Sequence, residues 1–160
     1  MVILVMGVAG SGKTTVGQML STQLNWPFVD GDSLHSPANI AKMAAGIPLT
    51  DEDRIPWLRS IHAVIQSWLD QGKGGIVASS ALKEGYRRML VTSADIKLVY
   101  LRGTYDVIFS RLQHRAGHYM KPEMLRSQFE ALEEPKDALI VDIAQPAEHI
   151  VSSIRGSLAI

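Results

Sequence analysis

Residues 7–14 have the types and the spacing of a phosphate-binding loop. They read G-V-A-G-S-G-K-T, which matches the pattern G-x-x-x-x-G-K-[ST]. Glycines allow the backbone to curve around phosphate groups with its N–H donors pointing inward, and a helix that follows adds its positive N-terminal end. Lys13 would bring a positive charge to the outer phosphates, and the Thr14 hydroxyl would bind Mg²⁺. The predicted nucleotide contacts in this segment are Gly7, Val8, Ala9, Gly10, Ser11, Gly12, Lys13, Thr14 and Thr15.

Two carboxylates follow the second predicted strand, beside this loop. Asp30 and Asp32 are two residues apart, and an extended backbone would point both side chains in one direction. One could order the water around Mg²⁺, while the other accepts a hydrogen bond from a substrate hydroxyl and orients it toward the terminal phosphate. We assign Thr14 and Asp30 to the metal and Asp32 to catalysis; from the sequence alone, the two Asp roles are nearly interchangeable. The alternative is that one Asp caps a helix beginning near residue 33.

Missing motifs exclude two classes of nucleotide-binding protein. A GTPase switch needs a D-x-x-G turn and an N-K-x-D base reader, and the sequence contains neither. A motor ATPase would usually have a metal-binding acid at the end of a later strand, whereas the third predicted strand here ends in V-A-S-S. The remaining possibilities are a small phosphotransferase or a nucleotide-binding regulatory module without turnover. The Asp pair and the basic segments described next favour the phosphotransferase.

Cationic side chains occur where an acceptor substrate could bind. A helical insertion, about residues 33–70, lies where small P-loop kinases hold their acceptor, and it contributes His35 and Arg54. An anionic, hydroxylated acceptor would need such groups for its anion and its hydroxyls. After the third strand come Lys83 and Arg87, four residues apart and therefore expected on one helical face. We expect at least one of them to face the substrate.

A second basic segment late in the chain is expected to form a lid. Arg111 and Arg115 are four residues apart on a predicted helix, and a glycine-containing basic loop follows them. We place the lid at about residues 114–126. Its closure over the nucleotide would exclude water, and Arg115 would bring charge to the transferring phosphoryl group. Arg111 and Arg115 are therefore predicted nucleotide contacts.

Short apolar runs alternate with helical patterns along the whole chain, which indicates a parallel sheet. The expected strands are residues 2–6, 28–29, 76–79, 96–101 and 138–142. The alternation predicts an α/β fold with five parallel strands, helices on both faces and ligands at the carboxyl ends of the strands, all within one domain, residues 1–160. Pro48 and Pro56 are expected to break the insertion into separate helices. Thr50 and Asp53 resemble a capping pair before a helix with Pro56 in its first turn.

Composition excludes several other functions. The 160 residues contain 16 Lys+Arg and 16 Asp+Glu, and this zero net charge argues against a nucleic-acid partner. Zero net charge also gives little repulsion between two copies of the chain, so the composition is compatible with a dimer. The absence of cysteine excludes disulfides, thiol catalysis and Cys-ligated metals, and it fits a cytoplasmic location. No apolar stretch approaches the roughly 20 residues that a membrane span requires.

Longer sequence words resemble one family over nearly the whole chain. Besides the phosphate loop these are D-G-D-S-L-H at residues 30–35, N-I-A-K-M at 39–43, G-I-P-L-T-D-E-D-R at 46–54, S-A-L-K at 80–83, Y-R at 86–87, G-H-Y-M-K at 117–121 and S-Q-F at 127–129. Together they resemble the small ATP-dependent gluconate kinases. One departure is Ser79, where that family often has cysteine; the change removes no charge.

This resemblance implies a specific activity and fold. It implies transfer of the ATP γ-phosphate to the 6-hydroxyl of D-gluconate, giving 6-phosphogluconate, with ATP and Mg²⁺ as cofactors. It also implies a nucleoside-monophosphate-kinase-like fold and a homodimer. It leaves open the individual roles of the predicted substrate contacts, which are Asp32, His35, Arg54, Lys83, Arg87 and Gln128. A kinase of the same architecture for another small acceptor, such as shikimate or a nucleoside monophosphate, is the alternative.

Overall fold

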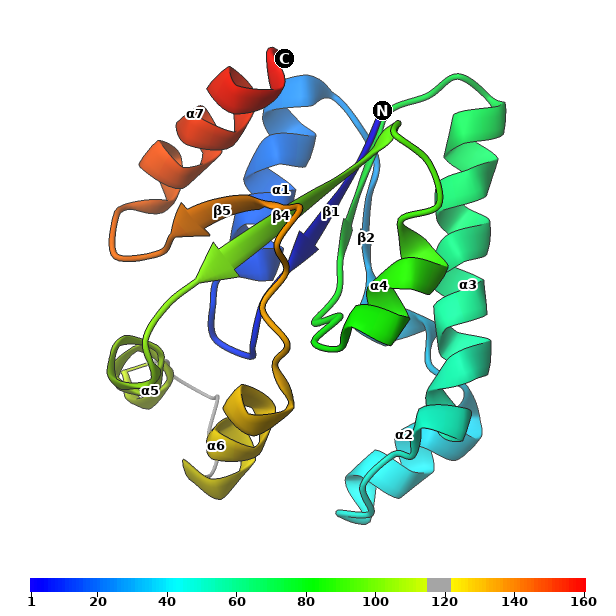
Figure 1. Cartoon of the computed structure of the whole chain (residues 1–160), viewed down its shortest axis with the longest axis vertical. Coiled ribbons are helices and arrows are strands. Elements are labelled where there is room, and N and C mark those ends of the chain that lie inside the picture. Colours follow the sequence, from blue (N-terminus) through cyan, green and yellow to red (C-terminus); the bar gives the residue numbers. More distant parts are fainter. Residues whose placement is uncertain (115–121) are drawn as a thin grey trace.

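The five predicted strands form one parallel sheet in the computed structural model, which describes residues 1–114 and 122–160. The strand order is β2-β3-β1-β4-β5 (Figure 1). Their bounds are β1 Val2–Met6, β2 Phe28–Asp30, β3 Gly75–Ala78, β4 Ile96–Arg102 and β5 Leu139–Asp142. All pairings are parallel, so the carboxyl ends of the strands meet at one edge. Ligands bind at that edge in open parallel sheets, and the phosphate loop follows β1 there.

Helices connect the strands and cover both faces of the sheet. They are α1 Lys13–Leu24, the short 3₁₀ helix η1 Gly31–Leu34, α2 Pro37–Ala44, α3 Asp51–Asp70, α4 Glu84–Leu90, α5 Tyr105–Gln113, α6 Pro122–Ala131 and α7 Ala147–Leu158. Helices α1 and α7 pack together on one face, and α3 and α4 pack together on the other. This arrangement confirms the predicted five-stranded α/β fold. Within residues 1–114 and 122–160, none of the helices combines the length and the hydropathy that a membrane span requires.

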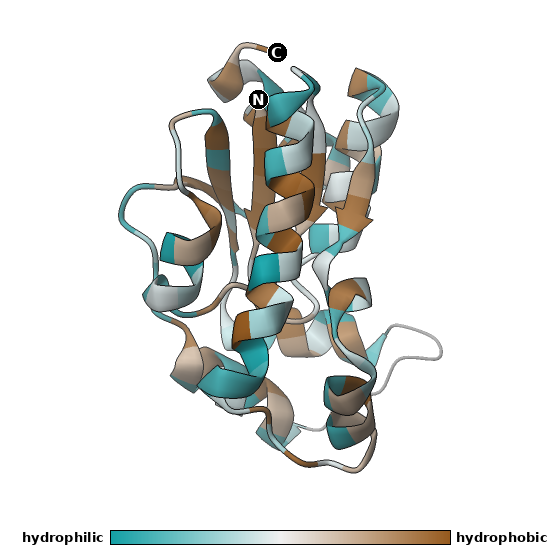
Figure 2. Ribbon diagram, turned by 90° about the vertical axis from the view of Figure 1, so that its right-hand side faces the viewer, coloured by the Kyte–Doolittle hydropathy of each residue, from teal (hydrophilic) through white to brown (hydrophobic). Residues whose placement is uncertain are grey.

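The central strand β1 separates two hydrophobic cores. All five of its residues are buried, and they alternate between the faces of the sheet as strand geometry requires. Ile3 and Val5 join the core beneath α1 and α7, whereas Leu4 and Met6 join the core beneath α3 and α4. Figure 2, viewed from the α3 side, shows the hydrophobic strands behind the mixed surface of that helix. Burial on both faces fixes the strand beneath the phosphate loop.

The helical insertion differs from expectation at Pro56. Thr50 caps α3 as predicted, because its hydroxyl accepts from the Asp53 N–H while the Asp53 carboxylate accepts from the Thr50 N–H. The prediction that Pro56 breaks the helical insertion is wrong: Pro56 is the sixth residue of α3, past the first turn, and the helix continues to Asp70. A proline removes one N–H from the helix, here the usual partner of the Glu52 carbonyl. Both residues are exposed, so water can serve that carbonyl instead.

Candidate active site

The phosphate loop connects the buried strand β1 to helix α1. Gly10 and Gly12 have φ angles of 79° and 95°, in the left-handed region that favours glycine. Gly12 precedes α1 without a side-chain cap, so the first N–H groups of the helix are open to an anion. The Ser11 hydroxyl is buried and, within residues 1–114 and 122–160, has no hydrogen-bond partner. These features fit a loop that wraps a phosphate chain.

Lys13 lies folded against its own loop. Its Nζ donates to the Gly7 carbonyl at 2.9 Å and to the Val8 carbonyl at 3.0 Å. Burial lowers its pKa from 10.5 to about 8, although the nearby Asp32 and Asp30 carboxylates oppose the shift. Desolvation therefore disfavours the charged form of Lys13 more than the two carboxylates favour it, so a bound polyanion would stabilise the ammonium.

Asp30 and Asp32 are both near Lys13, but a turn and not an extended backbone brings them there. Strand β2 ends at Asp30, and Asp32 lies in the 3₁₀ turn η1. The Asp30 side chain accepts from the Asp32 N–H at 3.0 Å and caps that turn. The extended geometry predicted for the pair is thus wrong, and the capping alternative holds for Asp30. A tight turn still brings both carboxylates close to the phosphate loop.

The Asp32 carboxyl has the electrostatics of a proton acceptor. Its pKa is raised first by partial desolvation and second by the Asp30 carboxylate, while Lys13 and His35 oppose the rise. A carboxylate is a stronger base when its pKa moves toward neutral pH. The environment therefore suits Asp32 to accept a proton from a hydroxyl more than an ordinary surface aspartate.

Two stacked aromatic rings, those of Trp57 and His35, lie beside these carboxylates, and the sequence did not predict the stack. Trp57 of α3 is buried, and its indole N–H donates to the Gly31 carbonyl at 2.7 Å. The His35 ring stacks on it, with centroids 4.3 Å apart and planes inclined by 12°. Burial lowers the pKa of His35, with Asp32 raising it and Arg54 lowering it further. The sequence did contain one signal for this feature, which is a tryptophan on the buried face of the predicted substrate-binding insertion.

Arg54 and Lys83 come together around a shared network. The Arg54 guanidinium donates to the Leu49 carbonyl at 2.8 Å and to the Tyr86 hydroxyl at 3.3 Å. The Tyr86 hydroxyl donates to Asp51 at 2.5 Å, and Lys83 pairs with the same carboxylate at 3.1 Å. Asp51 and Tyr86 were not predicted as site residues. The network joins the first turns of α3 and α4 and sets two cations near each other.

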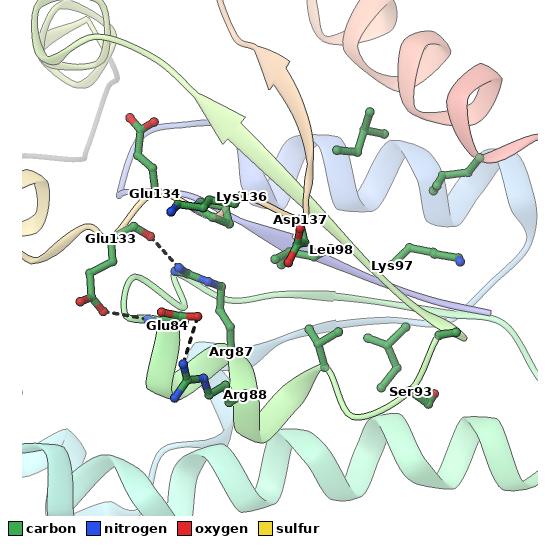
Figure 3. A pocket seen from close by; sticks show the side chains of 16 residues that line it. Glu84, Arg87, Arg88, Ser93, Lys97, Leu98, Glu133, Glu134, Lys136 and Asp137 are labelled. Atoms are coloured by element: carbon green, nitrogen blue, oxygen red, sulfur yellow. Dashed lines mark hydrogen bonds and ion pairs between the residues drawn. The ribbon is translucent and has the colours of Figure 1, made fainter.

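Arg87 is directed into the protein backbone. It is 6% exposed and donates to the carbonyls of Ala81 at 2.9 Å, Leu82 at 3.0 Å and Glu133 at 2.6 Å. Figure 3 shows it extending from α4 toward Glu133, in a hollow lined by α4, the beginning of β4 and residues 133–139. Lys83 is the N-cap of α4 and so precedes the helix. The expectation that Lys83 and Arg87 share one helical face is therefore wrong. This geometry favours a structural role for Arg87.

The contacts of Arg87 explain how the loop after β3 is held. Ala81 has a φ of 42°, a strained value for a residue with a side chain, and it is fully buried. Because Arg87 binds the Ala81 and Leu82 carbonyls, it stabilises the loop that leads to Lys83.

Gln128 contacts the phosphate loop itself. Its side-chain oxygen accepts from the Ala9 N–H at 2.7 Å, across a sequence separation of 119 residues. Tyr105 and Phe129 pack edge to face at 5.8 Å and hold α6 against α5. Arg111 is exposed at the end of α5 and donates to the Ile143 carbonyl. Arg115 and residues 115–121 of the predicted lid lie outside the described residues.

Comparisons with known proteins match the chain to kinases. The family model described as shikimate kinase matches residues 9–155. The thermoresistant gluconokinase of Escherichia coli K12 is 44% identical over 157 residues, covering 95% of this chain and 90% of that one. A probable gluconokinase of Mus musculus is 45% identical over 152 residues, covering 84% and 83%.

Solved structures give the same result. The crystal structure of a gluconokinase from Sinorhizobium meliloti 1021 is 44% identical and superposes with a TM-score of 0.85, covering 98% of this chain and 90% of that one. Shikimate kinase from Aquifex aeolicus has a TM-score of 0.65 at 21% identity, which is a likeness of fold alone. With this identity over nearly its full length, the chain belongs to the gluconokinase family of P-loop kinases.

Proposed function

We propose that this protein transfers the γ-phosphate of ATP to the 6-hydroxyl of D-gluconate, giving 6-phospho-D-gluconate. The observation that carries the proposal is 44% identity to a gluconokinase over 95% of the chain. The site residues add chemical support, because anion-binding, cationic and carboxylate groups meet at one edge of the sheet. An enzyme of this kind phosphorylates an alcohol group.

The phosphate loop would hold the nucleotide through its backbone N–H groups and Lys13. Thr14 and Asp30 are the groups we assign to Mg²⁺, which when bound would reduce the charge on the outer phosphates. In the described part of the chain, no cluster of three or more His, Cys, Asp or Glu could bind a metal by itself. That fits Mg²⁺, which takes one or two protein oxygens and completes its shell with phosphates and water.

The acceptor would bind between the insertion and the loop after β3. Arg54 and Lys83 are suited to the carboxylate of a sugar acid, and His35 to one of its oxygens. Asp32 would take the proton of the attacking hydroxyl as the new phosphate ester bond forms. Arg111, together with Arg115 in the proposed lid at residues 114–126, would contact the nucleotide phosphates.

A coupled ADP-release assay tests the proposed function directly. ATP and Mg²⁺ would be combined with gluconate, other sugar acids, shikimate or nucleoside monophosphates. We expect gluconate to stimulate ADP release far more than shikimate does. Stimulation by shikimate or a monophosphate and none by gluconate would refute the substrate, and ATP binding without any acceptor-dependent release would refute the kinase. The shikimate alternative has only the name of the family model and a likeness of fold in its favour.

Replacement of Gln128 separates nucleotide binding from acceptor binding. Gln128→Ala removes the acceptor that holds the Ala9 N–H, so the phosphate loop becomes less ordered. We expect the KM for ATP to rise about two- to tenfold, the effect of one net hydrogen bond, while the KM for gluconate changes less than twofold. Steady-state kinetics with each substrate varied in turn measures both. Gln18→Ala, at an exposed position of α1, is the matched control. If Gln128→Ala changed only the KM for gluconate, Gln128 would be a contact of the acceptor and not of the nucleotide.

ATP binding is expected to weaken as the pH rises above about 8. In the free protein Lys13 loses its proton near that pH, whereas the bound polyanion favours the ammonium form. Binding must then take up a proton, and the Kd should rise by up to about tenfold per pH unit. Calorimetry at pH 7.5 and 9 in buffers of different ionisation enthalpy would measure this uptake. Lys13→Arg, whose guanidinium does not titrate there, should lose the dependence; an unchanged pH profile in that variant would contradict the assignment.

We also propose that the protein is a cytoplasmic homodimer. The family resemblance supports the dimer, and the cysteine-free composition supports a reducing compartment. Size-exclusion chromatography with light scattering would distinguish a dimer from the 17.5 kDa monomer.

A further inference from the structure

Asn39 is a buried polar residue to which the proposed mechanism gives no role. It belongs to α2, is 5% exposed, and lies between the His35 ring and the backbone of α3. A buried amide needs hydrogen-bond partners, and Asn39 finds them in two different elements. Because Asn39 lies beside His35, a predicted substrate contact, the direction of these bonds bears on which ring nitrogen of His35 carries the proton.

The orientation of the Asn39 amide follows from its partner in α3. Nδ2 lies 2.8 Å from the carbonyl oxygen of Asp53, which can only accept a hydrogen bond. The amide nitrogen, and not its oxygen, therefore faces this region. The same nitrogen lies 3.3 Å from Nδ1 of His35, so its second hydrogen is available to that ring nitrogen. Nδ1 must then be the unprotonated acceptor.

The ring is held in this orientation by its stacking partner. His35 lies nearly parallel to Trp57, and Trp57 is itself anchored through its indole N–H to the Gly31 carbonyl. A flip of the ring would turn a C–H group toward Asn39 and lose the hydrogen bond. Within the described residues, no protein group hydrogen-bonds Nε2, so that nitrogen is available to a ligand.

We propose that Asn39 is a positioning residue that fixes His35 as a neutral imidazole protonated on Nε2, so that the ring donates an N–H to an oxygen of the acceptor. This inference rests on the proposed function for the identity of the acceptor. A neutral donor suits a hydroxyl or a carboxylate oxygen of a sugar acid, and a single tautomer avoids the free-energy cost of selecting one on binding.

The charges around the ring agree with a neutral state. Asp32 from η1 favours the imidazolium, Arg54 from α3 disfavours it, and burial disfavours it most. The uncharged Asn39 from α2 and Trp57 from α3 complete the surroundings. Burial, the largest of these effects, lowers the pKa of His35 and so favours the neutral imidazole over the imidazolium.

The tautomer can be measured without any enzymatic assay. Long-range ¹H–¹⁵N NMR of the free protein at pH 7.5 distinguishes a protonated from an unprotonated ring nitrogen, and loss of the signals in His35→Gln assigns them. We expect an unprotonated Nδ1 and a protonated Nε2. Asn39→Asp, which can accept but not donate, should shift the proton to Nδ1. A wild-type ring protonated on Nδ1, or on both nitrogens, would overturn the proposal whether or not gluconate is the substrate.

Kinetics then tests whether Asn39 acts through the ring. Asn39→Ala should raise the KM for gluconate about tenfold and leave the KM for ATP within twofold. His35→Gln keeps an amide donor near the Nε2 position and has no tautomer to fix. Adding Asn39→Ala to His35→Gln should therefore cause no further rise. A further tenfold rise in the double variant would overturn the proposal by showing that Asn39 acts independently of His35.

A matched control separates this effect from loosened packing of α2 on α3. Lys42 pairs with Asp53 at 3.0 Å across the same helix contact but does not touch His35. Lys42→Met should leave the His35 tautomer and the KM for gluconate unchanged. If Lys42→Met reproduced the kinetic effect of Asn39→Ala, the effect would come from the helix contact and the proposal would fail.

Discussion

Lys13→Ala is expected to lower kcat by about 10³ or more, which would leave phosphoryl transfer close to background. The Lys13 ammonium already lies against the phosphate loop, partly buried and 2.9 and 3.0 Å from two loop carbonyls, and it would stabilise charge on the outer phosphates during transfer. No backbone donor replaces a full positive charge at that position. The coupled ADP-release assay at saturating gluconate measures the loss.

The fold of the Lys13→Ala variant should be largely intact. Desolvation disfavours its ammonium more than Asp30 and Asp32 favour it, so removal takes away little stability from the free protein. Circular dichroism and the thermal unfolding midpoint would show this. Lys73→Ala, at an exposed position between α3 and β3, is the matched control and should keep normal turnover. Turnover near the wild-type value in Lys13→Ala would refute the mechanism.

Asp32→Asn is expected to reduce kcat by 10² to 10⁴ while ATP affinity changes little, the range for loss of a general base. Asparagine keeps the size of the side chain and its ability to accept one hydrogen bond, but it cannot take a proton from the attacking hydroxyl. The raised pKa of Asp32 supports this role, because partial desolvation and Asp30 make its carboxylate more basic. Single-turnover kinetics and nucleotide titration measure the two quantities separately.

Asp30→Asn provides the comparison that separates the two carboxylates. Asp30 caps the turn that carries Asp32, and we assign it to Mg²⁺. Its replacement should raise the Mg²⁺ concentration needed for half-maximal activity, a change that Asp32→Asn should not produce. If the metal dependence changed in Asp32→Asn and the kcat remained normal, the two roles would be exchanged.

Local sequence patterns were sufficient for much of this molecule. A continuous apolar run predicts a strand buried on both faces, and β1 is buried at every residue. The pair Thr50 and Asp53 predicts a helix start because both capping bonds lie within four residues. The phosphate loop is likewise local, since its function depends on backbone conformations that successive glycines permit. For such features, neighbours in the sequence are also the interacting partners.

Contacts between distant segments decided what several side chains do. Arg87 looked like a substrate cation because its sequence neighbours are basic, yet its donors reach the carbonyl of Glu133, 46 residues away. Gln128 reaches the phosphate loop across 119 residues, and Tyr86 reaches Asp51 across 35. Charge and spacing show that a side chain can bind an anion or a carbonyl. Only the packing of helices on the sheet determines which of these lies within hydrogen-bonding distance, because each partner is placed by a different element of the fold.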